Sequence, residues 1–291
     1  VSSKTLFGSC RVFIETILAK FGVEATLVDG DDNEAWKNAF RPNTTAVFLE
    51  SPANPTLDVV DIKFVCDVAH ENGALVVVDN VFATPLLQKP MQMGADIVIY
   101  SSTKHIDGQG RCLGGCILTS DEIMEEQILP YIRHTGPNMS PFNAWVMLKG
   151  METMDLRIEK MCSNAEKVAH ALTDLNVFTS VNYPTLDSFR QRELAMKQMS
   201  LGGSVVTMFV PEGRAQAFKF LNALEITDIS NNIGDAKSLM THPASTTHKS
   251  VEESSRLEMG ITDSMLRLSV GLEHADDLIE DFERAAKIAG R

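Results

Sequence analysis

Three short runs of consecutive apolar residues constrain the fold of this 291-residue chain more than any other feature. They span residues 45–50, 74–79 and 96–100, and β-branched side chains dominate the second and third runs. Such an uninterrupted run suits a strand that is covered on both faces, which is the environment of a parallel sheet. The pattern also predicts a strand over residues 25–29 and another over residues 116–119.

Helical patterns lie between these strands. Apolar residues recur at helical spacing over residues 11–21, and a second helix is predicted over residues 60–70, where Asn72 and Gly73 end it. Because strands alternate with helices, the sequence predicts an α/β fold with a mostly parallel central sheet and right-handed crossovers.

The pattern changes after about residue 140. Residues 143–171 predict one or two long helices, and residues 275–288 predict a closing amphipathic helix. Between them, residues 203–209 and 264–270 predict strands with alternating faces. These elements indicate a smaller α+β unit at the C-terminal side of the chain.

We therefore expect two domains, an α/β ligand-binding domain over residues 1–142 and a C-terminal domain over residues 143–291 that is entered through a long helix. The composition is 44% hydrophobic and 22% charged, which is typical of globular proteins. The formal net charge of −13 argues against nucleic acid or an anionic membrane as the main partner.

Membrane and secretory signals are not found in the sequence. No apolar run approaches the roughly 18–20 residues of a membrane span, and no signal peptide opens the chain. The five cysteines are scattered without a CxxC motif, which predicts reduced thiols in a cytoplasmic protein.

Polar side chains follow three of the predicted strands at the point where each strand ends. Asn54 follows the first strand, Asp79 ends the second, and Ser101, Thr103 and Lys104 follow the third. Ligands of doubly wound sheets bind beyond the carboxyl ends of the strands. We therefore expect these groups to share one edge of the sheet.

One cofactor uses all of these groups. Pyridoxal 5′-phosphate (PLP) needs a lysine for its aldehyde, an acid for its pyridine nitrogen and hydrogen-bond donors for its phosphate. A lysine in a dry pocket or near other cations has a lowered pKa and reacts with carbonyl groups. Taken singly, each residue also has a structural interpretation, with Asp79 as a helix cap and Lys104 as a solvated loop residue.

The same segments resemble the trans-sulfuration (Cys/Met metabolism) family of PLP-dependent enzymes. The resemblance covers the whole chain and implies a fold-type I PLP-dependent transferase with a smaller C-terminal α+β domain. Within the family, the chain is most similar to members that act on O-succinylhomoserine. The matching segments are residues 6–10, 51–55, 78–85, 94–96, 101–104, 105–115, 231–239, 242–245 and 266–273.

The resemblance implies a role for each residue around the cofactor. Lys104 would bind its aldehyde and act as the catalytic base, and Asp79 would keep the pyridine nitrogen protonated. Ser101 and Thr103 would bind the phosphate. Asn54 would lie beside the ring hydroxyl.

Further residues are implied at the ring face and the substrate. Phe7 would stack on the ring at a position where most relatives carry Tyr, so the phenol that relatives use for proton transfer is missing. Arg267 would hold the substrate α-carboxylate as a bidentate clamp, with help from Ser238. Arg111 is a candidate for the succinyl carboxylate of the substrate.

The implied reaction is γ-replacement on O-succinyl-L-homoserine by sulfide, which yields L-homocysteine and succinate in methionine biosynthesis. Cystathionine γ-synthase and methionine γ-lyase activities are alternatives within the family. Its members carry an N-terminal Tyr-x-Arg motif and a Gly-Met loop, and neither is found here, so the sequence is expected to begin within the cofactor domain. An inactive fragment or a non-catalytic subunit is therefore an alternative of another class. The family also implies a homotetramer, a dimer of dimers.

A metal site is not expected. His242 and His248 lie near Asp235, but their spacing is not that of a helical pair and Pro243 would disturb a helix. We expect this loop to line the substrate pocket instead, with Thr247 as a lesser candidate for contact.

Overall fold

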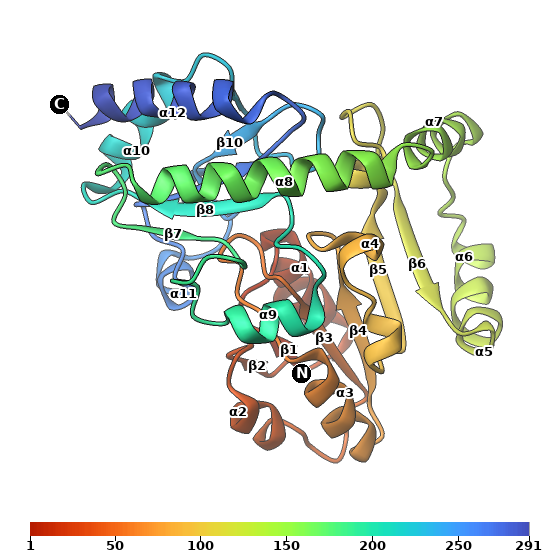
Figure 1. Cartoon of the computed structure of the whole chain (residues 1–291). Coiled ribbons are helices and arrows are strands. Elements are labelled where there is room, and N and C mark those ends of the chain that lie inside the picture. The colour runs from red at the N-terminus through yellow and green to blue at the C-terminus, as the bar shows by residue number, and fades with distance from the viewer. Residues whose placement is uncertain (291) are drawn as a thin grey trace.

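Residues 1–290 are described by a computed structural model, which contains two sheets and the helices that cover them (Figure 1). The first sheet has six strands in the order β2-β1-β3-β4-β5-β6. Its strands are β1 Ser2–Ser3, β2 Leu27–Val28, β3 Ala46–Glu50, β4 Leu75–Asp79, β5 Ile97–Ser101 and β6 Gly115–Thr119. The three apolar runs are thus confirmed as strands, and they lie next to one another in the sheet.

The first five strands are parallel, and β6 runs antiparallel to β5. The sequence pattern did not indicate this reversal. Ser101 at the end of β5 pairs with Gly115 at the start of β6. The chain between them therefore stays at the carboxyl edge, and the next strand has to run back along β5 because no crossover carries the chain to the other edge.

Helices of the first half lie on both faces of this sheet. They are α1 Gly8–Val12 with its extensions η1 Phe13–Ile17 and η2 Leu18–Phe21, α2 Asn33–Asn38, α3 Ile62–Glu71, α4 Thr84–Leu87, η3 Pro90–Met93 and η4 Ser102–Ile106. The inward side chains of α3 and Trp36 of α2 form one core with Val47, Leu49, Val76 and Val78 of the central strands. The predicted helices over residues 11–21 and 60–70 are confirmed, with shifted ends.

Helices also carry the chain from the first sheet to the second. They are α5 Asp121–Ile123, η5 Met124–Ile128, α6 Leu129–Thr135, α7 Pro141–Met151 and α8 Met154–Thr173. The long helix α8 crosses the second sheet in front of β8 (Figure 1). Ser140 caps α7 by accepting a hydrogen bond from the amide of Asn143.

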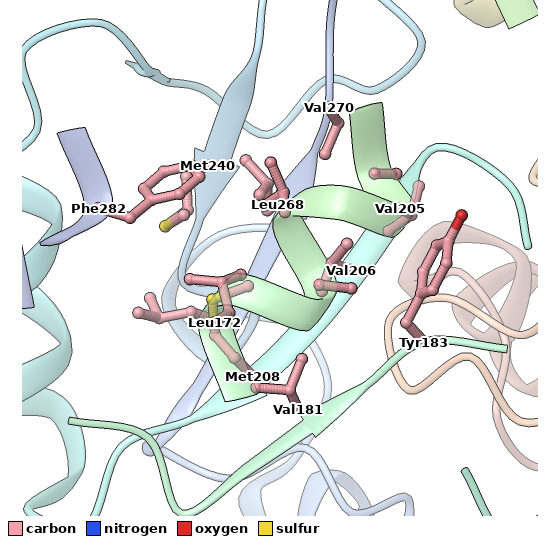
Figure 2. Close-up of a cluster of buried hydrophobic side chains, with 14 of the residues drawn as sticks. Leu172, Val181, Tyr183, Val205, Val206, Met208, Met240, Leu268, Val270 and Phe282 are labelled. Atoms are coloured by element: carbon pink, nitrogen blue, oxygen red, sulfur yellow. The ribbon is translucent and has the colours of Figure 1, made fainter. Parts of the chain in front are cut away.

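The second sheet has five strands in the order β7-β8-β11-β10-β9. Its strands are β7 Ser180–Asn182, β8 Val205–Phe209, β9 Asp228–Ile229, β10 Leu239–Thr241 and β11 Met265–Ser269. The remaining helices are α9 Arg192–Gln198, α10 Gly213–Asn222, η6 Pro243–Ser245, α11 Glu253–Glu258 and α12 Ala275–Ala289. Figure 2 shows Leu172 of α8 and Phe282 of α12 with Val206, Met208 and Leu268 in the core of this part.

The side chains of β11 alternate between two faces, since Leu266 and Leu268 belong to the core and Arg267 points away from it, but neither face is exposed. All five residues of β11 are buried, because helices cover one face of the sheet and the loop after β3 covers the other. Two hydrogen bonds mark this second contact: Thr207 donates to the carbonyl of Pro55, and Arg267 donates to Asn54. The carboxyl edge of the first sheet therefore faces the second sheet.

A side chain of α9 and that of its N-cap residue Gln191 also join the two halves. Gln198 accepts from the amide of Ile62 and donates to the carbonyl of Val60, and Gln191 makes the same pair of contacts with the main chain of Val59. Within residues 1–290, no helix combines the length and the apolar character that a membrane crossing requires.

Candidate active site

Lys104 lies at the carboxyl edge of the first sheet, three residues beyond the end of β5. Its Nζ donates to Oδ1 of Asn232 at 2.6 Å. Burial lowers the pKa of Lys104, and the positive charge of Arg267 lowers it further. Lys104 thus has the lowered proton affinity that a reactive amine requires.

Arg267 is a buried cation without a carboxylate partner. The side chain is 2% exposed on β11, and it forms no ion pair with a carboxylate of residues 1–290. Nη1 donates to Oδ1 of Asn54 at 2.8 Å, and Nη2 donates to the carbonyls of Asn231 and Asn232. In the described part of the chain, Nε has no hydrogen-bond partner. Burial lowers the pKa of Arg267 to about 10.

Asp79 ends β4 and is 8% exposed. Its Oδ1 accepts from the amide of Val81 at 3.0 Å. Burial raises the pKa of Asp79 to about 6, and the hydrogen bond from Val81 opposes this shift. A buried carboxyl group of this kind suits a ligand that brings a cationic or proton-donating group.

Asn54 and Phe7 are both hydrogen-bonded to Glu50, a residue that the sequence argument did not select. Glu50 at the end of β3 accepts from the amide of Asn54 at 2.8 Å and from the amide of Phe7 at 2.7 Å. The Phe7 ring is 36% exposed at the N-terminus of α1. The structure thus brings both residues to the edge that carries Lys104 and Asp79.

The two predicted phosphate-binding hydroxyls differ in their surroundings. Ser101 precedes η4 and its side chain makes no capping hydrogen bond to that helical turn. The Thr103 hydroxyl donates to the carbonyl of Gly114 at 3.3 Å and accepts from its amide at 3.1 Å. Thr103 would therefore have to bind the phosphate while its hydroxyl keeps these two contacts with Gly114.

The structure does not bring Ser238 and Arg111 into the same network. Ser238 is fully buried, donates to Oε2 of Glu273 at 2.8 Å and accepts from the amide of Gly271 at 2.9 Å. Arg111 forms an ion pair with the buried carboxylate of Asp107 at 2.9 Å. Their contacts to substrate stay predictions.

The loop that contains His242 and His248 makes contacts within the protein. The ring nitrogens of His242 contact the Ser245 hydroxyl and the carbonyl of Asp263. Those of His248 contact the Thr247 hydroxyl and the carbonyl of Leu6. Among residues 1–290, no group of three or more His, Cys, Asp or Glu side chains is arranged to hold a metal ion.

This loop closes on the segment that carries Phe7. A Cβ added at Gly8 would lie 2.5 Å from the carbonyl oxygen of Thr247, so only glycine allows the approach. Together with the bond from His248 to Leu6, this contact fixes the start of α1 against the C-terminal half of the chain.

Sequence reasoning missed Glu50 and Asn232. Glu50 ends an apolar run, so the pattern assigns it to the strand. A carboxylate at the end of a strand was nevertheless a sign of a functional residue. Asn232 lies in the segment 231–239 that carried the resemblance, but nothing local indicates that it reaches Lys104 across 128 residues.

A large cleft elsewhere in the protein does not mark this site. A cleft of about 760 Å³ lies on the other face of the first sheet, where Phe48, Val77 and Ile99 face Phe13 and Ile14. Neither Lys104 nor Arg267 lines it. We therefore locate the site by its buried charged groups and not by cavity size.

The residues at the sheet edge fit PLP. Lys104 is a buried amine of lowered pKa, and Asp79 is a buried carboxyl group with one amide donor on Oδ1. Arg267 offers an unpaired Nε that suits an anionic group of a ligand. This donor set matches the aldehyde, the ring nitrogen and the amino-acid carboxylate that a PLP enzyme has to hold.

Comparison with known proteins identifies the family. The family model described as Cys/Met metabolism PLP-dependent enzyme matches residues 1–287. The chain is 49% identical to O-succinylhomoserine sulfhydrylase of Mycobacterium tuberculosis over 289 residues, which cover 98% of this chain and 71% of the relative.

A methionine gamma-lyase and a solved structure are also similar to this chain. The chain is 40% identical to L-methionine gamma-lyase of Porphyromonas gingivalis over 285 residues, 97% of this chain and 71% of that protein. The crystal structure of metB from Corynebacterium glutamicum matches with a TM-score of 0.95 at 34% identity, covering 98% of this chain and 74% of metB. The chain therefore belongs to the Cys/Met metabolism family of PLP-dependent enzymes, with the fold-type I architecture.

Proposed function

We propose that the protein catalyses γ-replacement on O-succinyl-L-homoserine with sulfide. The Cγ–O bond breaks with release of succinate, and a Cγ–S bond forms to give L-homocysteine. The 49% identity to an O-succinylhomoserine sulfhydrylase supports this substrate and this sulfur donor. The reaction would serve methionine biosynthesis.

One observation carries the proposal of an amino-acid substrate. Arg267 is a buried guanidinium that forms no ion pair within residues 1–290, and its charge acts on Lys104. A buried charge without an ion-pair partner in direct contact is costly in free energy, even with the charge of Glu50 nearby. The carboxylate of an amino-acid substrate supplies the missing partner beside the reactive amine.

The residues of the chain divide the work. When bound, PLP supplies an electron sink for the charge that develops at Cα of the substrate. The neutral amine of Lys104 would take the Cα proton of the substrate and deliver protons along its carbon chain. Asp79 holds a proton at the ring nitrogen, and Arg267 orients the substrate through its carboxylate. Proton transfer by a positioned lysine contributes on the order of 10²–10⁴-fold to the rate.

Lys104 or water transfers these protons, because no tyrosine stands at the Phe7 position. The Tyr183 hydroxyl donates to the carbonyl of Gly203, and the Tyr100 hydroxyl accepts from Asn80. Both phenols are thus engaged inside the protein, which supports Lys104 or water as the proton carrier.

The experiment uses the full chain with added PLP. We expect a visible absorbance band that Lys104→Ala removes and Lys63→Ala keeps, since Lys63 is an exposed lysine of α3 paired with Asp67. We expect homocysteine from O-succinylhomoserine plus sulfide. Binding without turnover, or no binding at all, would favour an inactive fragment or a non-catalytic subunit.

A second candidate is a γ-lyase acting on methionine, which the 40% identity to a methionine gamma-lyase favours. Offering sulfide, cysteine and methionine in separate assays decides among the sulfhydrylase, cystathionine γ-synthase and lyase activities. Methionine breakdown that exceeds homocysteine formation would overturn our assignment.

We also propose that the protein is a cytoplasmic homotetramer. The five free cysteines support a reducing location. A stripe along α7 supports self-association, because four large apolar side chains of this helix are each more than half exposed: Phe142, Trp145, Leu148 and Met151. We propose residues 1–142 as the cofactor domain and residues 143–291 as the C-terminal domain.

A further inference from the structure

Glu50 is a buried carboxylate that the proposed reaction does not use. It is 4% exposed at the end of β3, in register with Asp79 of β4. Oε2 accepts from the amide of Phe7 at 2.7 Å, and Oε1 accepts from the amide of Asn54 at 2.8 Å. One carboxylate thus holds two separate segments, the start of α1 and the loop after β3.

The contacts of Glu50 continue to the lysine. Asn54 Oδ1 accepts from Arg267 at 2.8 Å, and Arg267 donates in turn to the carbonyl of Asn232 at 3.3 Å. The side chain of Asn232 accepts from Lys104 at 2.6 Å. A continuous set of hydrogen bonds therefore connects Glu50 with both the guanidinium and the amine of the site.

The charged and titratable groups that face Glu50 come from three elements: Asp79 on β4, Cys10 on α1 and Arg267 on β11. Burial raises the pKa of Glu50, and the charge of Asp79 raises it further, while the two amide bonds and Arg267 oppose the shift. Placing a second carboxyl group beside a buried one costs free energy. Packing alone does not account for a residue with this cost.

We propose that Glu50 is a positioning residue of the active site, which fixes Phe7, Asn54 and, through Asn54, the Arg267 guanidinium relative to Lys104. The inference rests on the proposed function, because this placement matters for catalysis only when Phe7, Asn54 and Arg267 contact cofactor and substrate. Glu50 itself is not proposed to exchange protons with the substrate.

Glu50→Gln tests the proposal against a matched control. The amide of glutamine has one acceptor oxygen, so one of the two main-chain donors loses its partner while side-chain volume is kept. Asp281→Asn is the control, because Asp281 is 1% exposed on α12 and accepts from the amides of Glu225, Ile226 and Thr227. Both variants replace a buried carboxylate by an amide, but only Glu50 lies at the active site.

The first readout needs no cofactor. Amide hydrogen exchange followed by NMR should show the amide of Phe7 or of Asn54 exchanging at least tenfold faster in Glu50→Gln, with both unchanged in Asp281→Asn. Unchanged exchange in Glu50→Gln would overturn the positioning role, whether or not the chain binds PLP. This separates failure of the inference from failure of the proposed function.

The second readout uses the protein loaded with PLP. In Glu50→Gln we expect the PLP dissociation constant to rise tenfold or more and the visible circular dichroism per bound PLP to fall by more than half. Asp281→Asn should stay within twofold of wild type in both. If both variants lose similar thermal stability and give the same dichroism, the role of Glu50 is only structural.

Glu50→Asp separates position from charge. It keeps the carboxylate but withdraws both oxygens by one methylene, so both amide contacts lengthen. We expect the same loss of dichroism as in Glu50→Gln. Wild-type dichroism and PLP affinity in Glu50→Asp would show that charge is sufficient, and would overturn the positioning role.

Discussion

The Nζ of Lys104 lies 2.6 Å from Oδ1 of Asn232, although 128 residues separate them in the chain. Lys104 belongs to η4 beyond the first sheet, and Asn232 lies in the loop before β10 of the second sheet. Burial and the charge of Arg267 lower the pKa of this lysine, while an acceptor oxygen on its ammonium favours the protonated form. The protonation of Lys104 is therefore set by residues of both halves.

Asn232→Ala should lower the pKa of Lys104 further, because the ammonium loses its acceptor. A hydrogen bond to a charged group contributes about 1.5–3 kcal/mol, so its loss should move the titration of Lys104 measurably to lower pH. The pH dependence of the rate at which the PLP-free protein reacts with PLP measures it. Asn231→Ala is the control, since Arg267 contacts only the main-chain carbonyl of Asn231. Equal pH profiles for both variants would contradict the assignment.

Arg267→Lys should weaken substrate binding while the protein still binds PLP. Lysine keeps the charge but not the planar set of donors that contacts Asn54, Asn231 and a carboxylate together. Loss of a charge-assisted hydrogen bond of about 1.5–3 kcal/mol corresponds to roughly a 10- to 150-fold rise in KM. KM and kcat measured separately for the variant check this, and a fall in kcat with unchanged KM would contradict it.

Asp79→Asn should stabilise the PLP-free protein at neutral pH and abolish its function. The pKa of Asp79 is about 6 in the folded protein and 3.8 in the unfolded reference, so the folded state holds its proton more tightly. Stability is therefore lost as pH rises from about 4 to about 6, and the deficit persists above that range. Asparagine does not ionise, so it removes this loss of stability, which amounts to about 1.4 kcal/mol for each pKa unit.

Denaturant unfolding at several pH values tests this prediction. The free energy of unfolding of Asp79→Asn should match wild type near pH 4 and exceed it above pH 6. Asparagine keeps an oxygen that accepts from the amide of Val81, so this contact is not the source of the difference. A variant less stable than wild type at pH 7.5 would refute the predicted cost.

Trp145→Glu should reduce the mass of the protein in solution if the α7 stripe is a contact between copies. The Trp145 side chain is 56% exposed, so a charge there need not disturb the core. Light scattering of wild type should give a tetramer, and the variant a smaller species. Leu257→Glu is the control, because Leu257 is 54% exposed on α11. A monomeric wild-type protein would exclude the proposed assembly.

Local patterns in the sequence were sufficient to predict most of the fold. Uninterrupted apolar runs and the 3.6-residue period depend only on neighbouring positions, so β3, β4, β5, α3 and α12 were recognisable without any tertiary contact. Polar residues at strand ends located Asp79 and Lys104 because all carboxyl ends of a parallel sheet meet at one edge. The order of these segments also indicated the family.

Other features depend on contacts between distant segments, and only the tertiary structure decided them. The direction of β6, the burial of both faces of β11, the pairing of Ser238 with Glu273, and the contacts of Glu50 and Asn232 are of this kind. No local period encodes them, since they arise when separate segments of the chain pack against one another. The sequence by itself determined which residues supply the chemistry, and packing determined which partners hold them, because the partners of Lys104 and Arg267 lie 128 and 213 positions away.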